Sequence, residues 1–224
     1  NRLTEFIQTR KPEAFATCTD RIGWHGGAFV LPLMTIGDDA ERVVFQSENQ
    51  MENTFRQKRD VADWVARIGA RCVGNSRLSF AVACAFAGPL LGPGGMESGG
   101  FHFRGDSSSG KTTALRLAAS VYGGQSYMQR WRTTDNALEA IAAQHCDGLL
   151  ILDELAQVEG KVAGECAYML ANERSKARAT RNGAPRARLS WRLLFLSAGE
   201  LGLADHMAEG MKRTRTGQEV RMAD

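Results

Sequence analysis

The sequence predicts an α/β protein whose core is a three-layer αβα sandwich around a mostly parallel sheet. From Gly100 onward, apolar strands alternate with helical segments, which is the pattern of strands joined by crossover helices. Residues 148–152 form an uninterrupted apolar run, typical of a strand buried on both faces. The chain has 224 residues, of which 43% are hydrophobic and 24% are charged, and this composition suffices to bury one large core.

Residues 1–55 indicate a small β-rich subdomain ahead of this core. A glycine-rich turn is expected at 23–27, followed by strands at 28–32 and 42–45. Each segment is short and bounded by turn-forming residues. We therefore expect this subdomain to have little core of its own.

Residues 56–98 indicate a helical region that packs on the core. Apolar residues recur at three-to-four spacing over 61–68, and the run 77–87 is nearly all apolar, as in a buried helix. Gly88-Pro89 ends that helix. The glycines that follow form the expected hinge to the core, residues 99–224.

Strands and helices alternate through residues 99–224. The expected strands are 101–104, 126–131, 148–152 and 193–196. The expected helices are 111–121 and 135–145, the second capped by Asp135 or Asn136. The chain starts at Asn1 and stops abruptly at Asp224, so we interpret it as part of a longer polypeptide that lacks a C-terminal lid.

The residues Gly105 to Thr112 complete a G-x-x-x-x-G-K-T motif, which we call the phosphate loop. It lies between an apolar strand and a helix, as nucleotide binding requires. Glycines let the backbone amides wrap around phosphate, and the helix N-terminus adds partial positive charge. Lys111 is expected on the β- and γ-phosphates of ATP, and the Thr112 hydroxyl on Mg²⁺. The expected nucleotide-binding residues are Gly105, Asp106, Ser107, Ser108, Ser109, Gly110, Lys111, Thr112 and Thr113.

Two acids follow the apolar strand 148–152, about forty residues after the phosphate loop. Asp153 is expected to hold the Mg²⁺ shell, and Glu154 to act as general base on the attacking water. Such a pair after a strand is often only a solvated loop. Together with the phosphate loop, however, it favours hydrolysis of the nucleotide over binding alone.

Ser197 lies just past the expected strand 193–196 and is a third candidate catalytic residue, beside Lys111 and Glu154. In ASCE-like P-loop ATPases, which have an additional strand between the two motifs, a polar residue at this place helps to position the lytic water. The alternative is an ordinary serine at a strand end, and the sequence leaves both open.

The segment from Arg174 to Gly199 carries seven basic residues and no acidic one. Asn182-Gly183 in its middle predicts a hairpin turn. Side chains two apart share a face of a strand, so the hairpin predicts a cationic ribbon for phosphate backbones. Its candidate contacts are Lys176, Arg178, Arg181, Arg186 and Arg188. The alternative is a solvated surface hairpin.

Arginines near the chain end are candidates for a finger supplied to the γ-phosphate of a neighbouring subunit. The two candidates are Arg215, which lies in a basic run, and Arg221. Exposed arginines near a chain end are more often simply solvated.

Charge and cysteine content indicate which kind of ligand and which redox compartment the sequence favours. Lys and Arg number 28 against 25 Asp and Glu, and the excess lies beyond residue 100, a weak pointer to an anionic ligand. Five widely spaced cysteines without a C-x-x-C pair argue against a disulfide framework or a zinc site and favour a reducing cytosol. The longest apolar stretch, 79–92, is too short to span a bilayer.

With these motifs in place, the chain resembles the DUF 927 family, found in primase–helicase-like proteins of phages, plasmids and mobile elements. The resemblance implies an AAA+-like ATPase core related to minichromosome-maintenance-type helicases, which assemble as rings on DNA. The family's usual Ser-Thr-Gly-Glu appears here as 197–200, Ser-Ala-Gly-Glu, which keeps the serine. The similar segments are 23–25, 29–32, 74–78, 85–91, 105–113, 152–155 and 191–200.

The sequence thus predicts a cytoplasmic, Mg²⁺-dependent ATPase, the helicase motor of a mobile-element replication protein acting on DNA. Single-stranded DNA is the expected partner, together with further copies of the chain, up to a hexameric ring. The alternative is an ATP-gated DNA-binding or assembly module that does not unwind DNA. Glu154 favours hydrolysis, since a pure switch does not need a general base.

Overall fold

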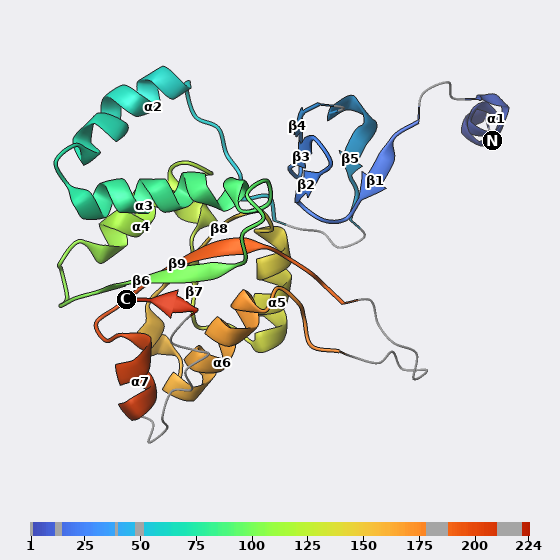
Figure 1. Ribbon diagram of the computed structural model, residues 1–224. Helices are drawn as coiled ribbons and strands as arrows, with labels where there is room; N and C mark the ends of the chain where they lie inside the picture. The colour runs from blue at the N-terminus through green and yellow to red at the C-terminus, as the bar shows by residue number, and fades with distance from the viewer. Residues whose placement is uncertain (1, 12–14, 39, 48–51, 178–187, 210–220) are drawn as a thin grey trace. The chain divides into compact units, whose positions relative to one another are not determined.

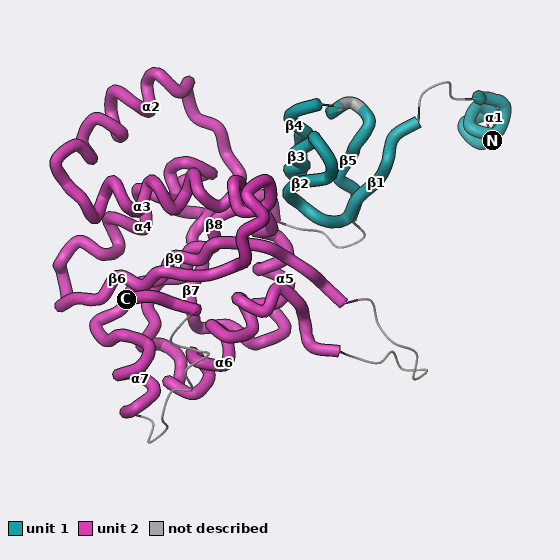
Figure 2. The backbone as a smooth tube through the Cα atoms, viewed as in Figure 1, with its two compact units in different colours: residues 1–51 teal, residues 52–224 magenta. Residues whose placement is uncertain are grey.

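The computed structural model describes residues 2–11, 15–38, 40–47, 52–177, 188–209 and 221–224. The chain divides into two compact units, residues 1–51 and residues 52–224 (Figure 2). The helical segment 56–98 belongs to the second unit, together with the phosphate loop and the acidic pair.

The first unit carries small sheets in its described residues. One is an antiparallel sheet in the order β2-β3-β4, and β1 pairs with β5 in parallel. Gly23-Trp24-His25, expected in a turn, forms strand β2 instead, and the turn is confined to Gly26-Gly27 because His25 already pairs with Ala28. The elements are α1 (Arg2–Thr9), β1 (Thr17–Thr19), β2 (Gly23–His25), β3 (Ala28–Val30), β4 (Thr35–Gly37), the 3-10 turn η1 (Ala40–Arg42) and β5 (Val43–Phe45).

The second unit is built on a parallel sheet of five described strands in the order β10-β6-β9-β8-β7. The predicted α/β fold with a mostly parallel sheet is confirmed. β9 lies between β6, which leads into the phosphate loop, and β8, which leads into the acids. The strands are β6 (Gly99–Arg104), β7 (Gln129–Arg130), β8 (Gly148–Asp153), β9 (Leu193–Gly199) and β10 (Met222–Ala223).

Helices cover both faces of this sheet, which gives the predicted three layers (Figure 1). α3 (Ser76–Ala87) and α4 (Lys111–Ala119) pack on one face with Leu149 and Leu196. α5 (Asp135–Gln144), α6 (Gly160–Ala171) and α7 (Leu203–Glu209) cover the other face with Leu150 and Phe195. The remaining elements are α2 (Val61–Arg67) and the 3-10 turns η2 (Gly69–Cys72), η3 (Gly88–Leu90), η4 (Gln125–Tyr127) and η5 (Leu155–Gln157).

Three sequence expectations about single elements are wrong. α3 is not buried all round: Phe80 and Phe86 are 40% and 53% exposed, because the fully buried face of the helix is formed by Ala81, Cys84 and Ala85. The strand expected over 126–131 is limited to β7, because Tyr127 belongs to a 3-10 turn. α5 is capped by Thr134 rather than by Asp135 or Asn136, since the Thr134 hydroxyl accepts from the amide of Ala137.

Candidate functional site

The phosphate loop joins the end of β6 to the start of α4. Ser108 and Gly110 take positive φ angles of 63° and 89°, which turn the chain tightly enough to lead straight into the helix. The helix cap Gly110 offers no side-chain hydrogen bond. The first amides of α4 therefore face outward without a side-chain cap, as a phosphate-binding helix N-terminus requires.

Lys111 folds back over the loop from the first position of α4. Its Nζ donates to the carbonyl oxygens of Gly105 (2.6 Å) and Asp106 (2.7 Å), and lies 3.3 Å from the Ser109 hydroxyl. The ammonium group is thus held by the backbone and the Ser109 hydroxyl of the phosphate loop itself. This is the geometry in which a bound phosphate would exchange for the loop carbonyls.

The parallel sheet brings the predicted catalytic residues to one edge, which we call the carboxyl edge. Arg104 of β6 pairs with Gly199 of β9, and Leu152 of β8 pairs with Ser197. Because parallel strands all end on the same side, the phosphate loop, the acidic pair and the end of β9 meet there. The sequence predicted these residues separately, and the fold places them together.

Glu154 is held by two residues that sequence reasoning missed. Its backbone has a φ of 63°, and its Oε2 accepts a hydrogen bond from Nε2 of Gln157. Nη1 of Arg130, the last residue of β7, lies 3.9 Å from the same oxygen. Arg130 ends the strand that pairs with β8, and this place at the carboxyl edge is known only from the fold.

The Mg²⁺ expected from the sequence fits the donor set at this edge. Thr112 offers a hydroxyl and Asp153 a carboxylate, both hard oxygen ligands, and Mg²⁺ is usually held by one or two protein oxygens plus phosphates and waters. No group of three or more His, Cys, Asp or Glu side chains gathers as a metal site in the described residues, and a site of this kind needs none. Asp153 Oδ1 accepts from the Glu154 amide at 2.9 Å, which orients the carboxylate.

Ser197 is fully buried and its hydroxyl is engaged within the protein. Nε1 of Trp131 donates to Ser197 Oγ at 2.7 Å, and Nδ1 of His102 lies 3.0 Å from it. His102 Nε2 lies 3.0 Å from the carbonyl of Leu201, and burial lowers the pKa of this histidine. The neutral ring therefore donates a hydrogen bond from Nε2 to the Leu201 carbonyl, and its Nδ1 accepts a hydrogen bond from the Ser197 hydroxyl. A water-positioning role for Ser197 stays a prediction.

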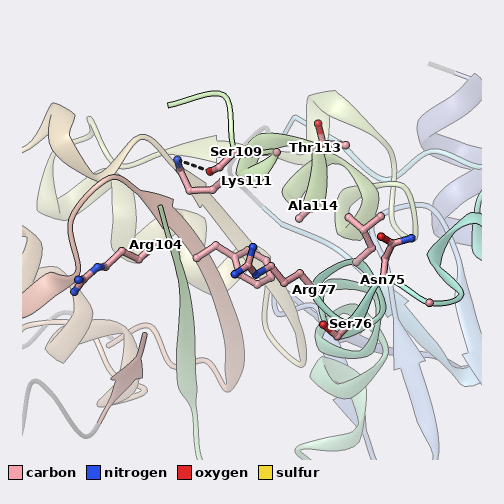
Figure 3. A pocket seen from close by; sticks show the side chains of 12 residues that line it. Asn75, Ser76, Arg77, Arg104, Ser109, Lys111, Thr113 and Ala114 are labelled. Carbon is pink, nitrogen blue, oxygen red and sulfur yellow. Dashed lines mark hydrogen bonds between the residues drawn. The ribbon is translucent and has the colours of Figure 1, made fainter. Parts of the chain in front are cut away.

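A pocket of about 570 Å³ lies beside the phosphate loop (Figure 3). One wall is formed by Ser109, Gly110, Lys111 and the first turn of α4, and the other by the start of α3. We call it the α3 pocket. Sequence reasoning placed residues 74–78 in a helical linker, and only the fold reveals that they face the loop, because the contact joins segments about thirty residues apart.

The flanks of the basic stretch run antiparallel, since Arg174 and Ser190 form a bridge and the Ser175 amide donates to the carbonyl of Leu189. Lys176 is paired with Asp135 of α5 at 2.8 Å, and this hydrogen bond raises the lysine's pKa. Arg188 is exposed. Arg178, Arg181 and Arg186 lie outside the described residues.

Of the two arginine-finger candidates, Arg221 lies within the described residues. Arg221 donates from Nη1 to Oδ1 of Asn172, and its guanidinium lies 4.8 Å from the ring centroid of Tyr168. Its carbonyl accepts from the Gly100 amide, at the amino-terminal edge of the sheet and away from the phosphate loop. Arg215 lies outside the described residues, and a finger role for either residue stays a prediction.

The comparisons with known proteins agree with this fold. The family described as "Domain of unknown function (DUF927)" matches residues 1–190. The solved structure described as "SCCmec type IV Cch - active helicase" is similar with a TM-score of 0.70 and 17% identity, over 99% of this chain and 42% of the helicase. That similarity shows a shared fold with a P-loop-like core.

A second solved structure, NtrX from Brucella abortus in complex with ADP, matches 74% of this chain and 42% of its own with 16% identity. Its TM-score of 0.33 is too low to support an argument. The chain therefore spans less than half of either solved structure. No curated protein matches the chain. Among the described residues, no helix combines the length and the apolar character needed to cross a membrane.

Proposed function

The chain belongs to the DUF927 family, and from its phosphate loop and acidic pair we propose that it binds and hydrolyses ATP with Mg²⁺ and acts on nucleic acid. One observation carries the proposal: the loop of Lys111 and the acids Asp153 and Glu154 end strands at the same edge of one parallel sheet. Lys111 and the α4 amides would hold the phosphates. Thr112 and Asp153 would hold Mg²⁺. The bound ion would neutralise the charge that develops on the transferred phosphoryl group.

Glu154 is the residue proposed to activate water. Its carboxylate is half-exposed at the carboxyl edge and accepts a hydrogen bond from Gln157 rather than from a buried donor. A general base needs this accessibility together with a fixed position near the γ-phosphate. Hydrolysis is therefore favoured over an ATP-gated assembly module without turnover.

The nucleic-acid part of the proposal rests on two supports. The structural neighbour with a TM-score of 0.70 is described as an active helicase. The exposed Arg188 lies two residues before Ser190, which bridges to Arg174, and the sequence of this segment is strongly basic. We propose single-stranded DNA as the partner and a ring of several copies as the working form.

Lys111→Ala tests the nucleotide site. We expect ATP binding, measured by calorimetry, to be lost, because the ammonium facing the β- and γ-phosphates is removed. Lys161→Ala is the matched control: Lys161 is an exposed lysine of α6 that pairs with Glu165 on its own helix. Unchanged ATP affinity in Lys111→Ala would overturn the proposal, and a loss in both variants would point to a general effect of charge.

A further inference from the structure

The α3 pocket has one wall whose purpose the phosphate loop does not explain. Asn75, Ser76 and Arg77, at the N-terminal end of α3, line this wall, and Lys111 lines the other (Figure 3). The volume of about 570 Å³ is within the range of small-molecule sites. It is much more space than the phosphates need, because those are held against the loop amides.

The direction of a bound nucleotide follows from the strand order. Asp153 and Glu154, which would act on the γ-phosphate and its Mg²⁺, end β8, and β9 separates β8 from β6. Neither acid lines the α3 pocket, whereas Phe103 at the end of β6 does. With its γ-phosphate directed to the acids, a nucleotide must extend its sugar and base the other way, into the α3 pocket.

Arg77 is the cation that the fold offers at this end. It is exposed, it extends from α3 into the pocket, and it pairs with no carboxylate of the described residues (Figure 3). Arg104, another lining arginine, instead extends away from the pocket to Asp205 at 2.9 Å. Among the described lining residues there is no acid, so no side chain of the pocket neutralises Arg77.

We propose that Arg77 binds the nucleoside end of the nucleotide in the α3 pocket, with its guanidinium plane against the face of the base. A guanidinium is planar and weakly hydrated, and it stacks on aromatic faces, whereas an ammonium group does not. The inference rests on the proposed nucleotide site and deepens it. It divides the work between two segments: the phosphate loop holds the phosphates, and the start of α3 holds the nucleoside.

The test compares ATP with inorganic triphosphate, which has the phosphates but no nucleoside. In Arg77→Ala we expect the affinity for ATP and for ADP to fall about tenfold, the loss of one partly desolvated cation–π contact. The affinity for inorganic triphosphate should stay unchanged. Arg77→Lys should restore only part of the ATP affinity lost in Arg77→Ala, because an ammonium group keeps the cation–π attraction and loses the planar stacking. Lys111→Ala should lose both ligands.

Arg71→Ala is the matched control, since Arg71 is an exposed arginine of η2 that does not line the pocket. Equal losses of ATP and triphosphate in Arg77→Ala would make Arg77 a phosphate ligand and overturn the inference. Unchanged ATP affinity in Arg77→Ala would also overturn it, while the proposed function would stand on the Lys111 result. If the unaltered chain binds neither ligand, the proposed function fails first and the inference with it.

Discussion

At the scale of single residues, Glu154 is held at the carboxyl edge in an unusual backbone conformation. A non-glycine residue with a φ of 63° costs about 1 kcal/mol relative to ordinary backbone, and such strain is retained where the surroundings hold it. Here Gln157, three residues on, and Arg130, from the neighbouring strand, contact the carboxylate. The side chain is thereby aimed by its backbone and by two partners, instead of rotating freely at a loop tip.

Glu154→Gln should separate binding from turnover. The variant keeps the side-chain shape and removes the base, so ATP should bind as before while turnover falls about 10²-fold or more. The measurements are calorimetric ATP affinity and steady-state phosphate release. Glu159→Gln, an exposed glutamate before α6 that makes no cap bond, is the control and should turn over normally. Normal turnover in Glu154→Gln would mean that Glu154 is only a loop residue.

The nucleotide-site residues that could be predicted from the sequence are those that belong to a contiguous motif. Lys111, Thr112, Asp153 and Glu154 stand in such motifs, and the sheet brings them to one edge. Arg77 and Arg130 are different, because what identifies them is a contact between distant segments. Each is an ordinary exposed arginine until the strand order and the packing of α3 are known.

At the scale of elements, β6 depends on two adjacent glycines that have different surroundings. A Cβ added at Gly100 would overlap the ring of Phe195, a fully buried side chain of β9. A Cβ at Gly99 would have its nearest neighbour, the Arg221 carbonyl oxygen, at 4.0 Å. The absence of a side chain at Gly100 therefore lets the Phe195 ring pack against β6, the strand that leads into the phosphate loop.

Gly100→Ala should accordingly destabilise the protein by about 1–3 kcal/mol, the usual cost of overpacking a dense core. Gly99→Ala is the matched control on the same strand and should change the free energy of unfolding by less than about 0.5 kcal/mol. Denaturant unfolding of both variants gives the answer. Equal stabilities would show that β9 moves to accept the methyl group.

The basic segment 174–199 was predicted from its charge count, and in the structure two of its basic residues form ion pairs with acids of other segments. Of the seven basic residues in 174–199, Lys176 is tied to Asp135, and Arg192 is tied to the fully buried Asp147 at 2.8 Å. A count of charges cannot tell such structural ion pairs from free cations, because their partners are far away in the sequence. All five candidates for nucleic-acid contact stay predictions, and Lys176 would have to leave Asp135 to make such a contact.

Arg178→Ala combined with Arg188→Ala should therefore weaken single-stranded DNA binding for all sequences alike. Each lost phosphate contact should reduce the slope of log affinity against log salt by roughly 0.7. Fluorescence anisotropy at several salt concentrations measures both quantities, and ATP affinity should not change. The double variant Arg71→Ala with Arg116→Ala removes the same charge elsewhere and serves as control. An unaltered slope in the first variant would leave these arginines as a solvated face.

At the scale of the whole molecule, periodicity was sufficient to predict the layered core but not its edges. β8 and β9 are continuous apolar runs buried on both faces, so their place in the middle of the sheet follows from composition. β10 has two residues, Met222 and Ala223, which pair in parallel with Gly100 and Phe101 of β6. Two residues carry no periodic signal, so the fifth strand was not predictable.

The same buried core contains a histidine that makes stability depend on pH. His145 directly follows α5. Its ring packs edge-on against Tyr127, with the ring centroids 4.9 Å apart, and its Nδ1 donates a hydrogen bond to the carbonyl of Ile141. Its Nε2 is buried without a partner among the described residues. Burial lowers the pKa of His145 to about 4.

Stability should therefore fall as the solution is acidified from about pH 6.5 toward pH 4. An unfolded histidine has a pKa of about 6.5, so below that pH the unfolded chain binds a proton that the folded chain excludes, and the loss levels off below the folded pKa. Between pH 7 and pH 5 His145 should lower the free energy of unfolding by on the order of 1–2 kcal/mol. His145→Gln, measured by urea unfolding at both pH values, should lose less stability over this interval than the unaltered protein does. Because each variant is compared with itself, a constant cost of the substitution cancels. Equal losses in the two proteins would mean that His145 is hydrated or protonated in the folded state.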